Sequence, residues 1–251
     1  MTTAQILGVP VHAMTRESVL AMCEHAVDSR TQLNISVVNA AKLVHMRHDE
    51  HLRRAVLGAD LVLADGQSVV WAGRLLRQPL HERVTGIDLF LDLLDRAERH
   101  GYTVYFLGGM PPVLQTMLAR LRERYPRLRV CGHRDGYFPV EESGAVAEQI
   151  RAADPDLLFV GMSSPRKEIF LETWGEHIGA RVRHGVGGSF DIVAGLTRRA
   201  PASWQRLGLE WLYRVKQEPR RLWKRYLTTN VVFLWLLARD LVSRRTHRPQ
   251  N

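Results

Sequence analysis

Short apolar runs alternate with amphipathic stretches through most of this chain, and this alternation limits the folds that it can adopt. Each run is four to six residues long, rich in β-branched and aliphatic side chains, and bounded by Gly, Asp or Pro. Runs of this length and composition predict strands. The predicted strands are Asn34–Val38, Ala59–Leu63, Thr103–Leu107, Arg129–Gly132, Leu157–Gly161 and Arg181–Val186.

The stretches between these runs carry apolar residues at helical spacing. They predict helices over Arg16–Ser29, Gly86–His100, Pro111–Tyr125 and Glu142–Ala153. Thr85 precedes the second helix as an N-cap, and Gly101 follows it as a stop. Strands that alternate with helices predict parallel strands joined by crossover helices, so the expected fold class is α/β.

The pattern changes near residue 201, after which no further strand is evident. We therefore divide the chain into a core, residues 1–200, and a helical appendage, residues 201–251. Pro219 is expected to open a helix that runs into the apolar stretch Val231–Ala238. That stretch is shorter than the 18–20 residues or so that a membrane span needs. The start shows no secretory signal, so we expect a cytoplasmic protein.

The positive charge is confined to the end of the chain. Residues 198–251 carry 13 Lys and Arg against 3 Asp and Glu, whereas residues 1–197 carry 22 against 23. A basic protein often binds nucleic acid. Here the core is neutral and the tail is basic and rich in Trp, which indicates an anionic surface rather than nucleic acid as the partner.

Polar and glycine residues follow the predicted strands, where open α/β sheets bind their ligands. Glycines at a strand end let backbone amides approach a phosphate, and the next helix adds partial positive charge. Tight turns alone also require glycine, so each one is weak evidence, and together they predict a nucleotide or phosphate ligand. The segments are Asn39, Ala64-Asp65-Gly66, Gly108-Gly109, Gly161–Pro165 and Gly185–Asp191.

Asp65 is the candidate general base of this set. A hydroxyl is a poor nucleophile until its proton leaves, and a carboxylate at a strand end can accept that proton. The alternative is that Asp65 caps a helix that starts near Gln67, and spacing alone favours the cap. Arg83, close to Asp88, could bind a phosphate or a sugar carboxylate, or form a surface salt bridge.

Two patterns invite a metal site, and neither supports one. Asp154-Pro155-Asp156 lies before a predicted strand, which is the wrong end for a ligand, so we interpret it as a turn. His45, His48 and His51 recur every three residues and are interpreted as a solvated helix face. We expect no metal.

Basic and aromatic residues lie together in the appendage. Arg214, Arg221, Lys224 and Arg225 are close to several Trp and Tyr residues, as in proteins that contact membrane headgroups. The same cations could bind the diphosphate of a lipid-linked substrate. The alternative is an interior packing helix with a solvated basic side.

Several segments, in order and at normal spacing, resemble the WecG/TagA/CpsF family of bacterial glycosyltransferases over nearly the whole chain. They are Ile6–Val11, Val37–Ala40, Leu63–Gly66, Glu82–Asp88, Tyr105–Gly109, Gly161–Glu168, Gly185–Asp191, Arg199–Pro201 and Leu209–Arg214.

The resemblance implies a Rossmann-like core with a membrane-docking appendage. It also implies inverting, metal-independent transfer from a UDP-sugar, with no other cofactor, to a sugar linked to polyprenyl diphosphate. Such enzymes work at the inner face of the cell membrane, form homo-oligomers and build exopolysaccharide, teichoic acid or enterobacterial-type antigen. The donors implied are UDP-N-acetylmannosamine, its uronic acid, or a hexose donor such as UDP-glucose.

The resemblance also assigns roles to residues. It makes Asp65 the general base, against the preference from spacing, and it places Asn39 and Arg83 in the sugar and phosphate pocket. Further substrate contacts are expected at Val37, Asp88, Gly108, Gly109, Gly161, Lys167, Glu168, Gly187, Gly188, Phe190 and Asp191. Arg199, Arg214, Arg221, Lys224 and Arg225 are expected at the lipid diphosphate and the membrane.

Two residues depart from the family pattern. Lys167 stands where members commonly have Gln, and Val37 where they often have Thr. A pocket built for an N-acetyl group would keep such polar partners, because unpaired buried groups are costly. We therefore hypothesise a donor other than UDP-N-acetylmannosamine, either a hexose or a uronic acid.

Two other functions compete with this one. A nucleotide-dependent oxidoreductase would need a Gly-x-Gly-x-x-Gly turn after its first strand, where this chain has Pro10-Val11-His12. A basic lipid- or nucleic-acid-binding module without catalysis would bind with steep salt dependence and would not need Asp65.

Overall fold

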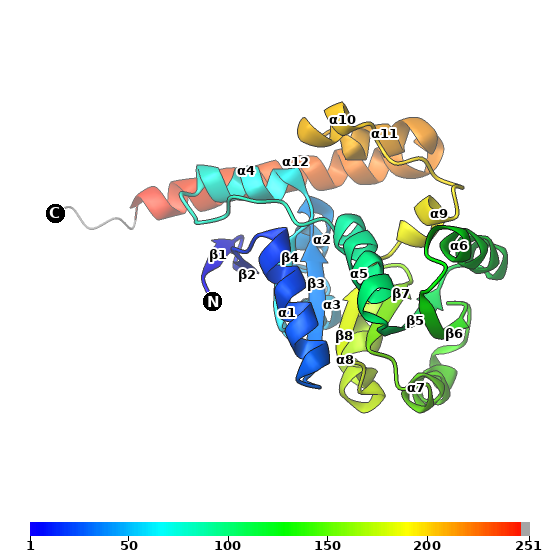
Figure 1. The fold of residues 1–251 in the computed structure, drawn as a ribbon. Coiled ribbons are helices and arrows are strands. Elements are labelled where there is room, and N and C mark those ends of the chain that lie inside the picture. Colours follow the sequence, from blue (N-terminus) through cyan, green and yellow to red (C-terminus); the bar gives the residue numbers. More distant parts are fainter. Residues whose placement is uncertain (247–251) are drawn as a thin grey trace.

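The computed structural model describes residues 1–246, apart from the side chains of Arg221, Arg225 and residues 244–246. It confirms the α/β class, with one parallel six-stranded sheet flanked by helices (Figure 1). The strand order is β4-β3-β8-β7-β5-β6. All six predicted strands are present, with ends displaced by at most two residues. They are β3 (Leu33–Val38), β4 (Leu61–Ala64), β5 (Thr103–Gly108), β6 (Arg129–Arg134), β7 (Leu157–Gly161) and β8 (Val182–Gly185).

An antiparallel hairpin, which the sequence analysis did not predict, precedes the sheet. Its strands are β1 (Thr3–Ile6) and β2 (Val9–His12). Leu7 and Gly8 form the turn with φ values of 52° and 78°. Positive φ at both central residues is typical of the type I′ turn, whose twist suits a hairpin. Pro10-Val11-His12, interpreted above as the segment after a first strand, is therefore itself a strand.

Helices cover both faces of the sheet, and the four predicted ones are α1, α5, α6 and α7. The Thr85 hydroxyl accepts a hydrogen bond from the Asp88 amide, and Gly101 ends α5 in the left-handed region, so both predicted caps are confirmed. The helices of the core are α1 (Arg16–Asp28), α2 (Ala40–His45), α3 (Glu50–Leu57), α4 (Gln67–Leu75), α5 (Gly86–His100), α6 (Pro111–Arg124), α7 (Ser143–Ala152), α8 (Arg166–Ile178) and α9 (Ser189–Val193).

The strand residues alternate between the two faces of the sheet. Val37 and Phe159 pack with α1, α5 and α6 in one apolar cluster. Val38 packs on the opposite face, in a cluster with α2, α3 and α4, while Val160 packs with α7 and α8. All six residues of β3 are buried, as expected of a central parallel strand covered on both sides.

Glycines at the ends of β5 and β7 make room for one aromatic ring. The Phe190 side chain is fully buried, and its ring centroid lies 5.9 Å from those of Phe90 and Phe106. A Cβ on Gly161 would lie 2.4 Å from the Phe190 ring, and a Cβ on Gly109 would lie 3.5 Å from it. Gly161 therefore lets the Phe190 ring pack against the backbone of β7, a structural use of the residue.

Three helices form the end of the described chain: α10 (Ala202–Arg206), α11 (Glu210–Gln217) and α12 (Pro219–Thr246). Figure 1 shows α10 and α11 lying over α12. Pro219 begins α12, as predicted. Phe233, Leu236 and Leu237 of α12 are buried in the same cluster as α2, α3 and α4. Within the described residues, no helix is long and apolar enough to cross a membrane.

The two metal-like patterns take structural roles. Asp156, at the amino end of β7, accepts hydrogen bonds from the Thr103 amide at 2.7 Å and hydroxyl at 2.9 Å, so its carboxylate joins β7 to the start of β5. The single helix predicted to carry His45, His48 and His51 is wrong. α2 ends at His45, a turn contains His48, and Asp49 caps the new helix α3.

We expect Gly161→Ala to lower the free energy of unfolding by about 1–3 kcal/mol, because the added methyl group overpacks the Phe190 ring. Gly188→Ala is the control, since its backbone has an ordinary φ of −75° and the nearest atom to an added Cβ is 3.8 Å away. Urea denaturation of both variants measures the difference. Equal losses would contradict the packing role of Gly161.

Candidate active site

The carboxyl ends of β3 and β4 bring together the first two predicted site residues. Asn39 follows β3 and Asp65 follows β4, and the Asp65 amide donates to the Val38 carbonyl at 2.9 Å. Asn39 is the N-cap of α2, and its Oδ1 accepts from the Lys42 amide at 3.0 Å. The cap uses the carbonyl oxygen of Asn39, so its side-chain nitrogen is the atom available to a ligand.

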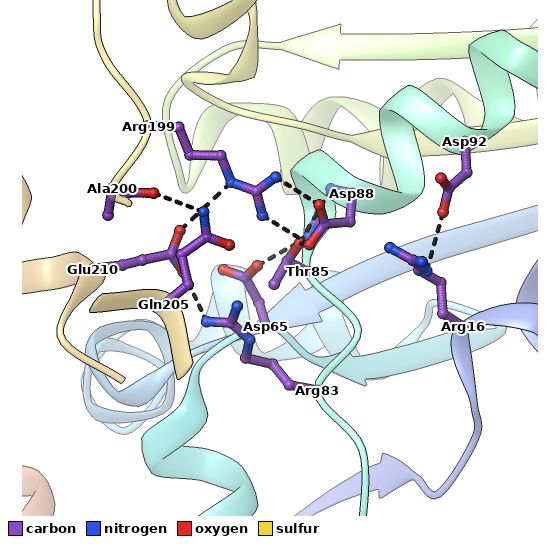
Figure 2. Close-up of polar contacts among 11 residues, drawn as sticks. Arg16, Asp65, Arg83, Thr85, Asp88, Asp92, Arg199, Ala200, Gln205 and Glu210 are labelled. Atoms are coloured by element: carbon purple, nitrogen blue, oxygen red, sulfur yellow. Dashed lines mark hydrogen bonds and ion pairs between the residues drawn. The ribbon is translucent and has the colours of Figure 1, made fainter. Parts of the chain in front are cut away.

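Asp65 does not cap the helix that follows it, which corrects the interpretation that spacing favoured. The N-cap of α4 is Gly66, without a side-chain cap. Instead, Asp65 Oδ1 accepts from the Gly86 amide at 2.9 Å, at the first residue of α5 (Figure 2). The helix N-terminus favours a carboxylate here. One oxygen is thus held by the backbone, and Oδ2 is the atom that can accept a proton.

Arg83 pairs with a carboxylate of the appendage. Its Nη1 donates to Oε2 of Glu210 in α11 at 2.7 Å, and the two side chains are 15% and 25% exposed. This salt bridge, shown in Figure 2, joins the core to the appendage rather than lying on the outer surface. Both side chains also face the cavity described below.

Asp88 belongs to the same set of ion pairs. Both of its carboxylate oxygens accept from Arg199, at 2.6 and 2.8 Å, and Thr85 donates to one of them at 2.5 Å. Burial alone would raise the pKa of Asp88, but the bonds from Arg199 and Thr85 outweigh it and lower the pKa. Arg199 Nε also lies 3.8 Å from Glu210 Oε1. Asp88 and Arg199 therefore bind each other and attach the segment before α10 to α5.

Asn39, Asp65, Arg83 and Glu210 line a cavity of about 190 Å³ between the core and the appendage, whereas Asp88 and Arg199 do not line it. It is open to solvent on one side and holds both acidic and basic side chains. Its walls combine strand ends, the starts of α2, α4 and α5, and residues of the appendage. The lining residues are Asn39, Ala40, Ala41, Asp65, Gly66, Gln67, Ser68, Arg83, Thr85, Ile87, Gly208, Glu210, Trp211, Arg214, Tyr226 and Asn230.

Sequence reasoning singled out four of these lining residues, Asn39, Asp65, Arg83 and Arg214. It missed the role of Glu210. Trp211 and Tyr226, whose ring centroids lie 5.8 Å apart, were among the aromatic residues assigned to membrane headgroups rather than to this cavity. The signal for Glu210 and Trp211 was their place in the Leu209–Arg214 segment, which carried the family resemblance. The signal for Tyr226 was its place among the basic and aromatic residues of the appendage, and the packing of α12 against α11 brings it to the cavity.

Lys167 and Glu168 do not line this cavity. Glu168 Oε1 accepts from Lys42 Nζ at 2.7 Å and from Lys167 Nζ at 2.5 Å, and all three side chains are buried. Burial would raise the pKa of Glu168, but the two ammonium groups outweigh it and hold the pKa at about 2. Burial, together with Lys42, lowers the pKa of Lys167 to about 8.

The remaining predicted residues are spread over the strand ends. Val37 is buried at the end of β3, with a methyl group 3.5 Å from where a Cβ of Gly86 would lie. Gly187, Gly188 and Asp191 lie at the start of α9. Gly109, Gly161 and Phe190 form the packing contact described above, and a Cβ on Gly108 would lie 2.5 Å from the backbone of Gly161. None of these residues lines the cavity that holds Asp65.

The predicted basic residues of the appendage lie at different places. Arg214 is exposed and lines the cavity. Lys224 is exposed on α12, with its Nζ 5.6 Å from the Trp223 ring. Arg221 and Arg225 were also predicted, and their side chains lie outside the described part of the structure.

The arrangement supplies a carboxylate for proton transfer and cations for an anionic ligand. Across residues 1–246, no three His, Cys, Asp or Glu side chains lie close enough together to hold a metal ion. Backbone amides at the starts of α4 and α5 add partial positive charge at the cavity. These parts suit the displacement of an anionic leaving group by a hydroxyl.

Comparison with known proteins agrees with this chemistry. A family model described as the glycosyl transferase WecG/TagA/CpsF family matches residues 4–247. The chain is also 35% identical, over 189 residues, to a protein of Bacillus spizizenii. That protein is named N-acetylglucosaminyldiphosphoundecaprenol N-acetyl-beta-D-mannosaminyltransferase, and the match covers 75% of this chain and 72% of the relative.

We expect Glu168→Gln to lower the free energy of unfolding by about 3–5 kcal/mol, because it leaves two buried cations without a counter-charge. Lys167→Gln is the control and should cost much less, since Lys42 and Glu168 then form a neutral pair. The pKa of Glu168 is depressed in the folded state, so its stabilisation is full above pH 4.5 and is lost as the pH falls toward 2.

Thermal or urea denaturation between pH 2 and 7 measures both effects. The difference between wild type and Glu168→Gln should shrink through this acid range. A difference independent of pH, or an equal loss in Lys167→Gln, would show that Glu168 does not act through its charge.

Proposed function

This chain belongs to the WecG/TagA/CpsF family of glycosyl transferases, and from this we propose that it transfers a sugar from a UDP-sugar to a sugar linked to polyprenyl diphosphate. The relative from Bacillus spizizenii supports this acceptor, because its name specifies N-acetylglucosaminyl diphosphoundecaprenol. The product would be part of a cell-surface polysaccharide, and the enzyme would work at a membrane surface, where such a lipid resides.

One observation carries the proposal: Asp65 lies in the cavity with one oxygen held by the start of α5 and the other available. In our mechanism the acceptor hydroxyl attacks the anomeric carbon of the donor. Its proton passes to Asp65 Oδ2, a glycosidic bond forms, and the bond from the anomeric carbon to UDP breaks. A single displacement of this kind inverts the anomeric configuration.

The leaving diphosphate gains negative charge in this step, and the cavity offers groups that stabilise it. Arg83 and Arg214 supply guanidinium groups, and the first residues of α4 and α5 supply amides. Arg83 would have to share its guanidinium between the diphosphate and Glu210. Because these groups can stabilise the charge without a metal ion, we propose metal-independent transfer.

For the donor, we place UDP-N-acetylmannosamine first, since the relative is named for N-acetylmannosamine transfer. The hypothesis of a hexose or uronic acid donor rested on Lys167 and Val37. Lys167 has its own buried partner in Glu168, so its charge does not require a ligand. A panel of UDP-sugars, with UDP-glucose and the uronic acid included, decides between these donors.

We expect Asp65→Asn to lower kcat by about 10²–10⁴-fold, the usual contribution of a general base, with little change in the donor KM. The amide oxygen of Asn can still accept from Gly86, so the fold is kept and only proton transfer is lost. Asp95→Asn, a change of a 44% exposed carboxylate on α5, is the matched control.

The assay is acceptor-dependent release of UDP in the presence of EDTA. Release that survives EDTA and disappears in Asp65→Asn supports the mechanism. Equal rates for Asp65→Asn and wild type would rule out Asp65 as the base, and loss of activity in EDTA would rule out metal independence.

A further inference from the structure

An apolar groove of about 660 Å³ lies between α4 and the appendage. α4 forms one wall and α12 the other, with part of α11 at one end. The large side chains along these two walls are Trp71, Leu75, Trp223, Leu227, Val231 and Leu234. Its volume is within the range of a binding pocket for a small ligand.

The groove is exposed to solvent although its walls are firmly held. The six wall side chains are between 48% and 63% exposed. Phe233, Leu236 and Leu237 of the same helix are at most 6% exposed and pack into the core, and Phe233 and Leu237 also line the groove. Concentrated exposed apolar surface of this kind marks a binding site rather than ordinary surface variation.

The groove is continuous with the cavity that contains Asp65. Four residues line both: Ser68, Gly208, Trp211 and Asn230. Gly208 has a φ of +66°, and a Cβ there would lie 2.9 Å from the Trp71 ring and 3.0 Å from Gln67. Glycine at this position lets the turn before α11 approach α4 closely, at the junction between groove and cavity.

Polarity changes along this path in the order that an amphiphile requires. Asp65, Arg83 and Arg214 line the cavity, the four shared residues form the junction, and hydrocarbon side chains line most of the groove. With the acceptor sugar near Asp65 and its own diphosphate at the junction, beside Ser68, Trp211 and Asn230, an attached chain would lead into the groove. Resting on the proposed function, we propose that the groove binds the isoprene units of the acceptor nearest to its diphosphate.

Two acceptors that differ only in chain length test this inference without a membrane. One is N-acetylglucosamine linked through diphosphate to an isopentenyl group, and the other carries a farnesyl group. Both are used in dilute buffer, free of vesicles and micelles. Each buried methylene group raises affinity roughly fourfold. Burial of even a third of the added carbons therefore raises kcat/KM by about a hundredfold in the wild type.

Leu75→Ser and Leu234→Ser alter opposite walls of the groove at side chains that are 55% and 63% exposed, so the fold should tolerate them. We expect each variant to reduce the farnesyl-to-isopentenyl ratio by about tenfold. Val140→Ser, at a 74% exposed side chain outside the groove, is the control and should keep the ratio of the wild type.

Calorimetric titration of the enzyme with each acceptor, in the absence of donor, measures the farnesyl-to-isopentenyl ratio as a ratio of binding affinities. It separates this inference from the proposed function, because an enzyme that transfers no sugar can still show the chain-length ratio. Conversely, if wild type and groove variants are all active with the same farnesyl-to-isopentenyl ratio, the proposed transferase function stands and the groove assignment is wrong.

Two other occupants would give different results. If the groove faces a lipid bilayer, the variants will lose sedimentation with anionic vesicles while the chain-length ratio stays unchanged. If the groove is instead an interface with a second copy of the chain, the variants will change the molecular mass in solution, and the chain-length ratio will again stay unchanged. Either result would overturn the assignment to the polyprenyl chain.

Discussion

Ion pairs between the core and the last helices determine the shape of the candidate active site. Asp88 binds Arg199, Arg199 lies close to Glu210, and Glu210 binds Arg83. The side chains are at most 25% exposed, so removal of one member would leave a poorly solvated charge beside the cavity. The same contacts hold the start of α11 over the sheet. Both the cavity and its junction with the apolar groove therefore depend on them.

These pairs also bear on how the cavity can attract a phosphate. Arg83 faces Glu210 and Arg199 faces Asp88, so much of the charge near the cavity is already balanced. Attraction must then come largely from Arg214 and from backbone amides, which carry partial positive charge without a counter-ion. The starts of α4 and α5 meet beside Asp65, where such amides are concentrated. One of them, from Gly86, holds the carboxylate.

The sheet could be predicted from sequence because several of its buried strands are continuous apolar runs, as β4 and β7 show. The hairpin was missed because its strands have only four residues and one contains Pro10. Glycine at strand ends was ambiguous, since the pattern that suits a phosphate also suits the Phe190 ring. Asp65 was identified, but its partner Gly86 and the pairing of Arg83 with Glu210, 127 residues away, depend on tertiary contacts that local spacing does not encode.

The apolar segment of α12 does not reveal from its sequence alone which neighbours its different sides contact. Residues 231–238 of α12 are almost entirely apolar, and a helix that is apolar on all sides needs apolar neighbours on more than one side. The core provides one neighbour, against which Leu236 packs. Val231 and Leu234 instead face the groove, whose far wall belongs to α4. Because this second apolar side opens into the cavity with Asp65, a ligand with both a polar head and a hydrocarbon chain matches it better than a flat apolar surface does.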